Sequence, residues 1–236
     1  MVDTENDRCE EKTGWEVPGK YNRSEICCLQ RALRYVIERM PTRKNDVAVI
    51  GSAALYWYQI ASNIGPVWDD GPNDIDVFVA GKTGRSRSNF GRFVKGCISR
   101  LEDSGREILD SKLFFNTYVI EGKRVAIHNI KVKDFPQQIS FIQCPTDDSV
   151  REVASRFDIS VCKVIYHIHK CKYEMTADVM EDIMDGKARM ERNFKFAKAG
   201  NPSRFEMTRI KRSMNRMRKY TKRGFDFYNG HGVTFA

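Results

Sequence analysis

Apolar and polar positions follow two rhythms along the first eighty residues of the chain. Apolar side chains recur every three to four positions over 24–40, which is the period of one helix face. A short apolar run at 46–50 then ends at Gly51-Ser52, the pattern of a buried strand entering a tight turn. Helix-compatible residues fill 53–60, and 73–79 alternates polar with apolar, which predicts a half-buried strand.

The second half of the chain changes rhythm twice. A helix is predicted over 90–103, and a β-hairpin is predicted beyond it, because Glu121-Gly122-Lys123 separates two β-rich runs. Further short elements follow, and from 176 onward the pattern is helical. The predicted later elements are hairpin strands 112–120 and 124–132, a third strand at 139–144, one or two helical turns at 149–155, a fourth strand at 158–166, and a last helix from Pro202 to Gly224.

This order of elements predicts an α+β fold. A helix, a strand–turn–helix unit and several antiparallel-looking strands precede the final helices, so we expect a mixed β-sheet flanked by helices. Three regions are expected: a loose polar lead-in at 1–22, a main domain at 23–175, and a basic helical C-terminal region at 176–236.

Composition narrows the class of protein. The chain has 236 residues, 41% of them hydrophobic and 30% charged, which is enough to bury a core and excludes a wholly disordered chain. No window approaches 18 uninterrupted apolar residues, and the first residues are acidic and polar, so neither a membrane span nor a secretory signal is expected. Seven cysteines without a regular framework predict reduced thiols in an intracellular, cytoplasmic protein.

The net charge of +9 is concentrated at one end of the chain. Between Lys187 and Arg223 there are 14 Lys/Arg and 2 acidic residues, a net of +12, which leaves −3 for the remainder. Clustered basic residues of this kind suit a polyanion such as RNA, because they release counterions from phosphate backbones. A solvated helical face explains the charge equally well at this point.

Two motifs suggest a site for phosphate chemistry. Asp74 and Asp76 stand at i and i+2 of one predicted strand, so both carboxylates point to the same face and repel each other. A cation relieves that repulsion, and a carboxylate pair that leaves positions for substrate phosphates suits Mg²⁺ or Mn²⁺. Gly51-Ser52 offers backbone N–H groups, a hydroxyl and a helix N-terminus, which together suit a phosphate.

These residues carry a resemblance. The chain resembles the nucleotidyltransferase superfamily of DNA polymerase β-like fold, in particular variants from large DNA viruses, fungi and algae. The matching blocks, which cover roughly 45 to 227, are Gly51-Ser52-Ala53-Ala54-Leu55-Tyr56, a Trp-containing insertion with Trp68, Asp74-Ile75-Asp76-Val77-Phe78, Phe157-Asp158-Ile159-Ser160-Val161-Cys162, and Lys219-Tyr220-Thr221-Lys222-Arg223-Gly224-Phe225.

The resemblance implies a nucleotidyltransferase fold, with roles for specific residues. Asp74 and Asp76 would bind the metal, and Ser52, after Gly51, would hold the β- and γ-phosphates of a nucleoside triphosphate. The superfamily uses a third carboxylate on a neighbouring strand, but 139–144 holds no acid. Asp158 is the candidate to take its place, and Lys82, after the acid strand, is a further candidate for contact with the triphosphate.

The C-terminal helix supplies the candidate nucleic-acid contacts. Ile210, Met214 and Met217 form a stripe that we expect to be buried, which turns the basic residues outward to face a phosphate backbone. Those basic candidates are Lys211, Arg212, Arg218, Lys219 and Arg223.

Three functions remain open from the sequence. The favoured hypothesis is Mg²⁺-dependent transfer of a nucleotide from an NTP to an acceptor hydroxyl, most plausibly on RNA. The alternative is an inactive nucleotidyltransferase-fold protein that binds RNA, such as a viral structural or replication component. A transferase that acts on protein is a third hypothesis. The nucleotide, the acceptor and the oligomeric state are left open.

Overall fold

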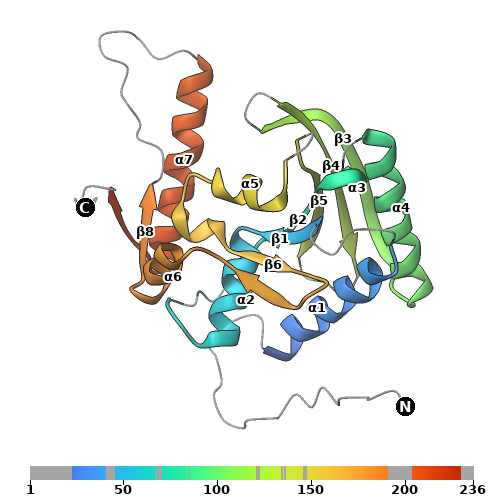
Figure 1. Ribbon diagram of the computed structural model, residues 1–236, viewed down its shortest axis with the longest axis horizontal. Helices are drawn as coiled ribbons and strands as arrows, with labels where there is room; N and C mark the ends of the chain where they lie inside the picture. Colours follow the sequence, from blue (N-terminus) through green and yellow to red (C-terminus); the bar gives the residue numbers. More distant parts are fainter. Residues whose placement is uncertain are drawn as a thin grey trace.

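The chain folds around a seven-stranded mixed sheet (Figure 1). This computed structural model describes residues 23–40, 46–66, 68, 71–84, 86–120, 123–133, 135, 137–145, 148–190 and 204–229. The strand order is β3-β4-β5-β2-β1-β6-β7, and every neighbouring pair is antiparallel except β2 with β5. The strands are β1 (Val47–Ile50), β2 (Asp74–Val79), β3 (Ile108–Ile120), β4 (Lys123–Val132), β5 (Gln138–Gln143), β6 (Ile165–His167) and β7 (Lys172–Glu174).

Helices cover both faces of this sheet. Apolar residues of α1, α2 and α4 join the larger core cluster with the inward side chains of β1 and β2, such as Val49 and Val77. On the other face α5 packs on Ala48, Phe78 and Ile142 in a second cluster. The helices are α1 (Arg23–Glu38), α2 (Ser52–Ser62), α3 (Gly81–Gly84), α4 (Arg87–Asp103), α5 (Val150–Ser155), α6 (Ala177–Met184) and α7 (Arg204–Lys222).

The coarse prediction of an α+β protein with a mixed sheet between helices is confirmed. The strand-then-turn at 46–52, the acid-bearing strand and the hairpin of β3 with β4 all form where the pattern indicates. The one parallel pair in this sheet, β2 with β5, makes it mixed, and a long excursion through α4, β3 and β4 separates the two strands in the chain.

The fourth predicted strand, 158–166, is also wrong. A 3₁₀-helix, η1 (Ser160–Lys163), occupies its middle, and only β6 at its end pairs with β1. Ile159 forms an isolated bridge with Met190. The apolar run is buried on all sides, and a run of that kind fits a compact turn as well as a strand.

The C-terminal region is not purely helical. It contains a two-stranded parallel sheet, β8 (Lys187–Met190) with β9 (Asp226–Asn229). Ile183, Tyr220 and Phe225 belong to the same core cluster as β1 and β2, so this region shares the core of the main domain. The lead-in at 1–22 lies outside the described residues.

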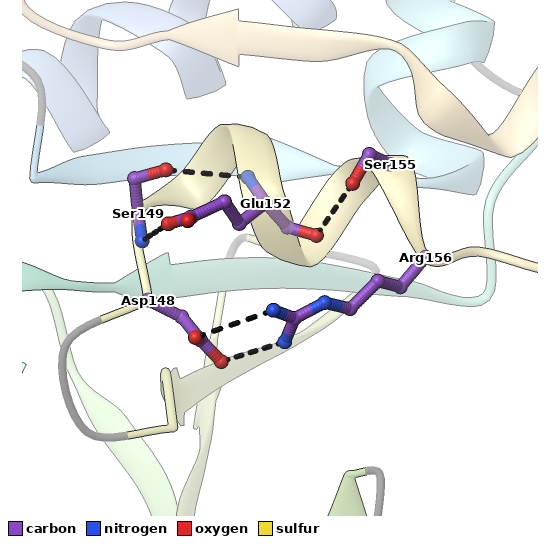
Figure 2. A network of polar contacts seen from close by, with 5 residues as sticks. All are labelled: Asp148, Ser149, Glu152, Ser155 and Arg156. Carbon is purple, nitrogen blue, oxygen red and sulfur yellow. Dashed lines mark hydrogen bonds and ion pairs between the residues drawn. The ribbon is translucent and has the colours of Figure 1, made fainter.

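The short helix α5 is fixed at both ends by polar contacts (Figure 2). Ser149 and Glu152 form a capping box, and Arg156 donates to Asp148 at 2.7 Å. A capping contact of this kind contributes about 1 kcal/mol, which matters for a helix of six residues. The ordered helix sets the start of the next segment, in which Phe157 contacts Phe78 with ring centroids 6.0 Å apart.

Candidate active site

Asp74 and Asp76, the acid pair, lie on the sheet face that α5 partly covers. Ile75 and Val77 point into the larger core, so the two aspartates alternate onto the opposite face, where both are half-buried. In the register of β2 with β5, Asp76 pairs with Ser140 and Asp74 with Gln138. The strand next to the acid pair therefore presents a hydroxyl and an amide.

The turn between β1 and α2 ends beside the acid pair. Val49 pairs with Val77, so the end of β1 runs antiparallel past the start of β2 and brings Ser52 toward Asp74. Gly51 has φ +91° and ψ −143°, a conformation that suits glycine alone, and a Cβ there would stand 3.4 Å from Phe157. No side chain caps α2, which leaves its first N–H groups without a side-chain partner at the end of β1.

The last turn of α7 reaches the same place. Burial, aided by the Arg223 charge, lowers the pKa of Lys219, while Asp74 and Asp76 oppose that change, so the ammonium lies within electrostatic reach of the acid pair. Tyr220 is buried, and a hydrogen bond with Ser52 counteracts part of the rise that burial causes in the pKa of its hydroxyl. Lys219 was expected on the outer surface, and the structure corrects that expectation.

Arg223 is also misplaced by the sequence prediction. It is only 6% exposed, its guanidinium lies 4.3 Å from the Trp68 ring centroid, and it donates to the Gly71 carbonyl at 3.2 Å. Tyr220 contacts the same indole with centroids 6.4 Å apart. Arg223 therefore ties α7 to the Trp68 segment and is not an outward phosphate contact.

Burial and the neighbouring Asp74 charge raise the pKa of Asp76 to about 8, against a lowering by Lys219. Burial and the like-charged neighbour outweigh the ammonium, so this carboxyl holds its proton near neutral pH. A divalent cation between the two carboxylates would reverse that preference. The donor set thus fits one Mg²⁺ or Mn²⁺ ion held by Asp74 and Asp76.

Asp158 does not join the acid pair. Its carboxylate is buried and accepts hydrogen bonds from Ser213 at 2.6 Å and Arg216 at 2.5 Å. Among the described residues no group of three or more His, Cys, Asp or Glu side chains is arranged for a metal ion. The contacts of Asp158 anchor α7, and its role as a third carboxylate stays a prediction.

The remaining candidates divide by position. Lys211, Arg212 and Arg218 are exposed on α7, as predicted. Met214 is 40% exposed, so the expectation of a buried stripe is wrong there. Lys82 belongs to α3, beyond the end of β2 that lies away from Asp74, and its side chain is outside the described part.

Sequence reasoning missed the direction in which α7 faces. The charge of Lys219 predicts an exposed position, whereas Tyr220 next to it is buried, which marks this turn of α7 as an inward one. Ser140 lies in the run 139–144, which holds no acid, and its pairing with Asp76 follows only from the register of the sheet.

Comparison of the chain with family models and with curated proteins finds no match in either. The fold and site by themselves define an α+β protein with a mixed sheet that carries a carboxylate pair beside an uncapped helix N-terminus. No helix in the described part of the chain is long and apolar enough to cross a membrane.

Proposed function

We propose that this protein is a divalent-metal-dependent nucleotidyltransferase of the DNA polymerase β-like fold, and that it transfers a nucleotide from an NTP to an acceptor hydroxyl on RNA. One observation carries the proposal: the acid pair, the Gly51-Ser52 turn and Lys219 converge from three separate parts of the chain. Such a convergence of carboxylates, helix N–H groups and an ammonium suits a triphosphate with its cation.

The negatively charged residues of the site bind the cation, and its hydrogen-bond donors and positive charge bind the phosphates. The acid pair holds the cation, which neutralises phosphate charge and lowers the pKa of the acceptor hydroxyl when it is bound. Ser52 and the first N–H groups of α2 bind the leaving phosphates, and Lys219 adds a positive charge beside them. The acceptor oxygen bonds to the α-phosphorus, the bond to the pyrophosphate oxygen breaks, and the hydroxyl proton leaves to solvent.

The first test is metal-dependent transfer by purified protein. With labelled NTP, Mg²⁺ or Mn²⁺ and RNA, Asp74→Asn and Asp76→Asn are each expected to lower the rate at least about 100-fold, because removing an electrostatic contact to the reacting phosphate costs that much. Asp226→Asn, an exposed aspartate on β9, is the control and should retain the rate. Equal transfer by all three variants would contradict the proposal.

A second candidate is a nucleotidyltransferase-fold protein that binds RNA without catalysis. The observation that favours it is the pairing of Asp76 with Ser140, together with the engagement of Asp158 by Arg216. RNA binding that falls steeply with salt, unaltered by Mg²⁺ or NTP and without any transfer, would identify it.

A further inference from the structure

On the same sheet face as the acid pair, two rows of side chains cross four strands. The register aligns Asp76, Ser140, Asn129 and Lys112 in one row, from β2 through β5 and β4 to β3. The next row is Phe78, Ile142, Ile127 and Phe114. Side chains of paired residues point to the same face, so both rows lead from the acid pair to the edge strand β3.

The outer half of this face carries an exposed aromatic ring and exposed basic side chains. We define the sheet platform as Lys112, Phe114, Asn129 and Lys131. Phe114 is 39% exposed, and Lys112 and Lys131 are exposed beside Asp110, with which Lys112 pairs at 2.6 Å. Together the two lysines and the single carboxylate carry a net charge of +1.

Asn129 supplies an unused hydrogen-bond acceptor in this platform. Its Oδ1 atom is buried and has no hydrogen-bond partner among the described residues. A buried amide oxygen without a partner costs free energy, and a donor from a bound molecule would satisfy it. The ribose 2′-hydroxyl is such a donor, and DNA lacks it.

The geometry of phosphoryl transfer decides what lies on the platform. The attacking and leaving oxygens are in line across the phosphorus, so the acceptor approaches from the side opposite the pyrophosphate. The Gly51-Ser52 turn belongs to β1, on one side of β2, whereas β5, β4 and β3 lie on the other. The acceptor side is therefore the side of the platform.

We infer that the sheet platform binds the 3′-terminal stretch of a single-stranded RNA acceptor and directs its terminal hydroxyl past Ser140 to the acid pair. Phe114 stacks on a base, Lys131 and Lys112 contact phosphates, and Asn129 accepts from a ribose 2′-hydroxyl. The inference rests on the proposed function for the direction of the RNA, whereas the binding itself needs neither metal nor NTP.

The test measures binding alone, by fluorescence anisotropy of a short 5′-labelled single-stranded RNA with full-length protein in EDTA. Phe114→Ala is expected to raise Kd about 5- to 100-fold, the loss that removal of one stacked base causes. Leu113→Ala is the matched control: its side chain is 38% exposed on the opposite face of the same strand, where Leu113 pairs with His128. It should change Kd less than about twofold.

Two further arms address the ribose and the direction of the RNA. Asn129→Ala is expected to weaken RNA binding and to leave binding of the same DNA sequence unchanged. The ratio of the affinities for RNA and DNA should therefore decrease. A photoreactive 4-thiouridine at the 3′ end should cross-link to β5, and one placed further toward the 5′ end should cross-link to β3.

Three results would each overturn the inference. They are an equal change in Kd for Phe114→Ala and Leu113→Ala, an equal affinity for RNA and DNA, and cross-links in the reverse order. Failure of the proposed function is a separate result. If the protein transfers no nucleotide but binds RNA through Phe114 and Asn129, the platform inference holds and the proposed enzymatic function fails. If the protein transfers nucleotides and Phe114→Ala changes neither the transfer rate nor the Kd, the proposed function holds and the platform inference fails.

Discussion

At the scale of single residues, Asp76 is the group whose charge the fold disfavours most plainly. Burial comes first among the causes that raise its pKa to about 8, and the Asp74 charge comes second. A carboxyl held in this way adds no stability to the fold, which fits a group whose role is to bind a cation.

The pKa of Asp76 predicts a falling stability with rising pH. Between its ordinary value near 4 and the folded value of about 8, the native state binds more protons than the unfolded state, so the free energy of unfolding decreases across that window. Without divalent ions, Asp76→Asn should flatten this slope and raise Tm at pH 7.5 by roughly 2–4 °C, the equivalent of about 1 kcal/mol.

Thermal unfolding in EDTA at pH 5.5, 6.5, 7.5 and 8.5 measures this slope, with Asp226→Asn as the exposed control. Added Mg²⁺ or Mn²⁺ should raise Tm of the unaltered protein most at the higher pH values, because the ion binds the deprotonated pair. Parallel pH profiles for the unaltered protein and Asp76→Asn would show that this carboxyl ionises normally.

At the scale of elements, α7 does two things at once. Its outer side carries Lys211, Arg212 and Arg218. Its last turn brings Lys219 within electrostatic reach of the acid pair and lets Tyr220 form a hydrogen bond with Ser52. A helix divides its residues among faces by a period of 3.6, so a single basic helix presents one side to solvent and another to the acid pair.

The contact that fixes α7 is Asp158 with Ser213 and Arg216. Asp158→Asn should lower the free energy of unfolding by about 1–3 kcal/mol, since it weakens the acceptor for a buried hydroxyl and a half-exposed guanidinium. The Mg²⁺-induced rise in Tm should persist, because the acid pair remains. Urea unfolding with and without Mg²⁺ measures both quantities.

Ser213→Ala is the companion variant, which should lower stability in the same direction without altering any carboxylate. Normal stability of Asp158→Asn combined with a lost response to Mg²⁺ would assign Asp158 to the metal and not to α7.

Periodicity located most elements well but not their partners. The strand bearing the acid pair, the hairpin and α2 follow from alternation and turn residues at 73–79, 112–132 and 51–60. The parallel pairing of β2 with β5 and the 3₁₀ turn at Ser160–Lys163 do not, because both depend on contacts between segments distant in sequence.

At the scale of the whole molecule, the basic C-terminal segment is less free than its composition indicates. Arg189 bonds to Asp182, Arg223 stacks on Trp68, and Lys219 lies within electrostatic reach of the acid pair. Among the described residues, exposed charge available to a polyanion includes Lys211, Arg212 and Arg218 of α7 and the two lysines of the sheet platform.

Salt dependence of RNA binding tests that distribution. Replacing Lys211, Arg212 and Arg218 together by Gln should reduce the slope of log K against log salt by about 2, since each single-strand phosphate contact contributes about 0.7. The control replaces Arg31, Arg92 and Lys95, exposed on α1 and α4 across the sheet, and should leave the slope unchanged. Equal slopes for the two triple variants would remove α7 from the RNA contact.

By itself the sequence determined the α+β class, the shared face of Asp74 and Asp76, and the strand-to-helix turn at Gly51-Ser52, because each depends on residues close together in the chain. Only the tertiary structure decided that Lys219 faces inward, that Asp158 holds α7, and that Ser140 and Asn129 extend the row from Asp76. Those outcomes depend on which segments pack together, and burial of apolar surface and satisfaction of buried polar groups choose the packing over the whole chain.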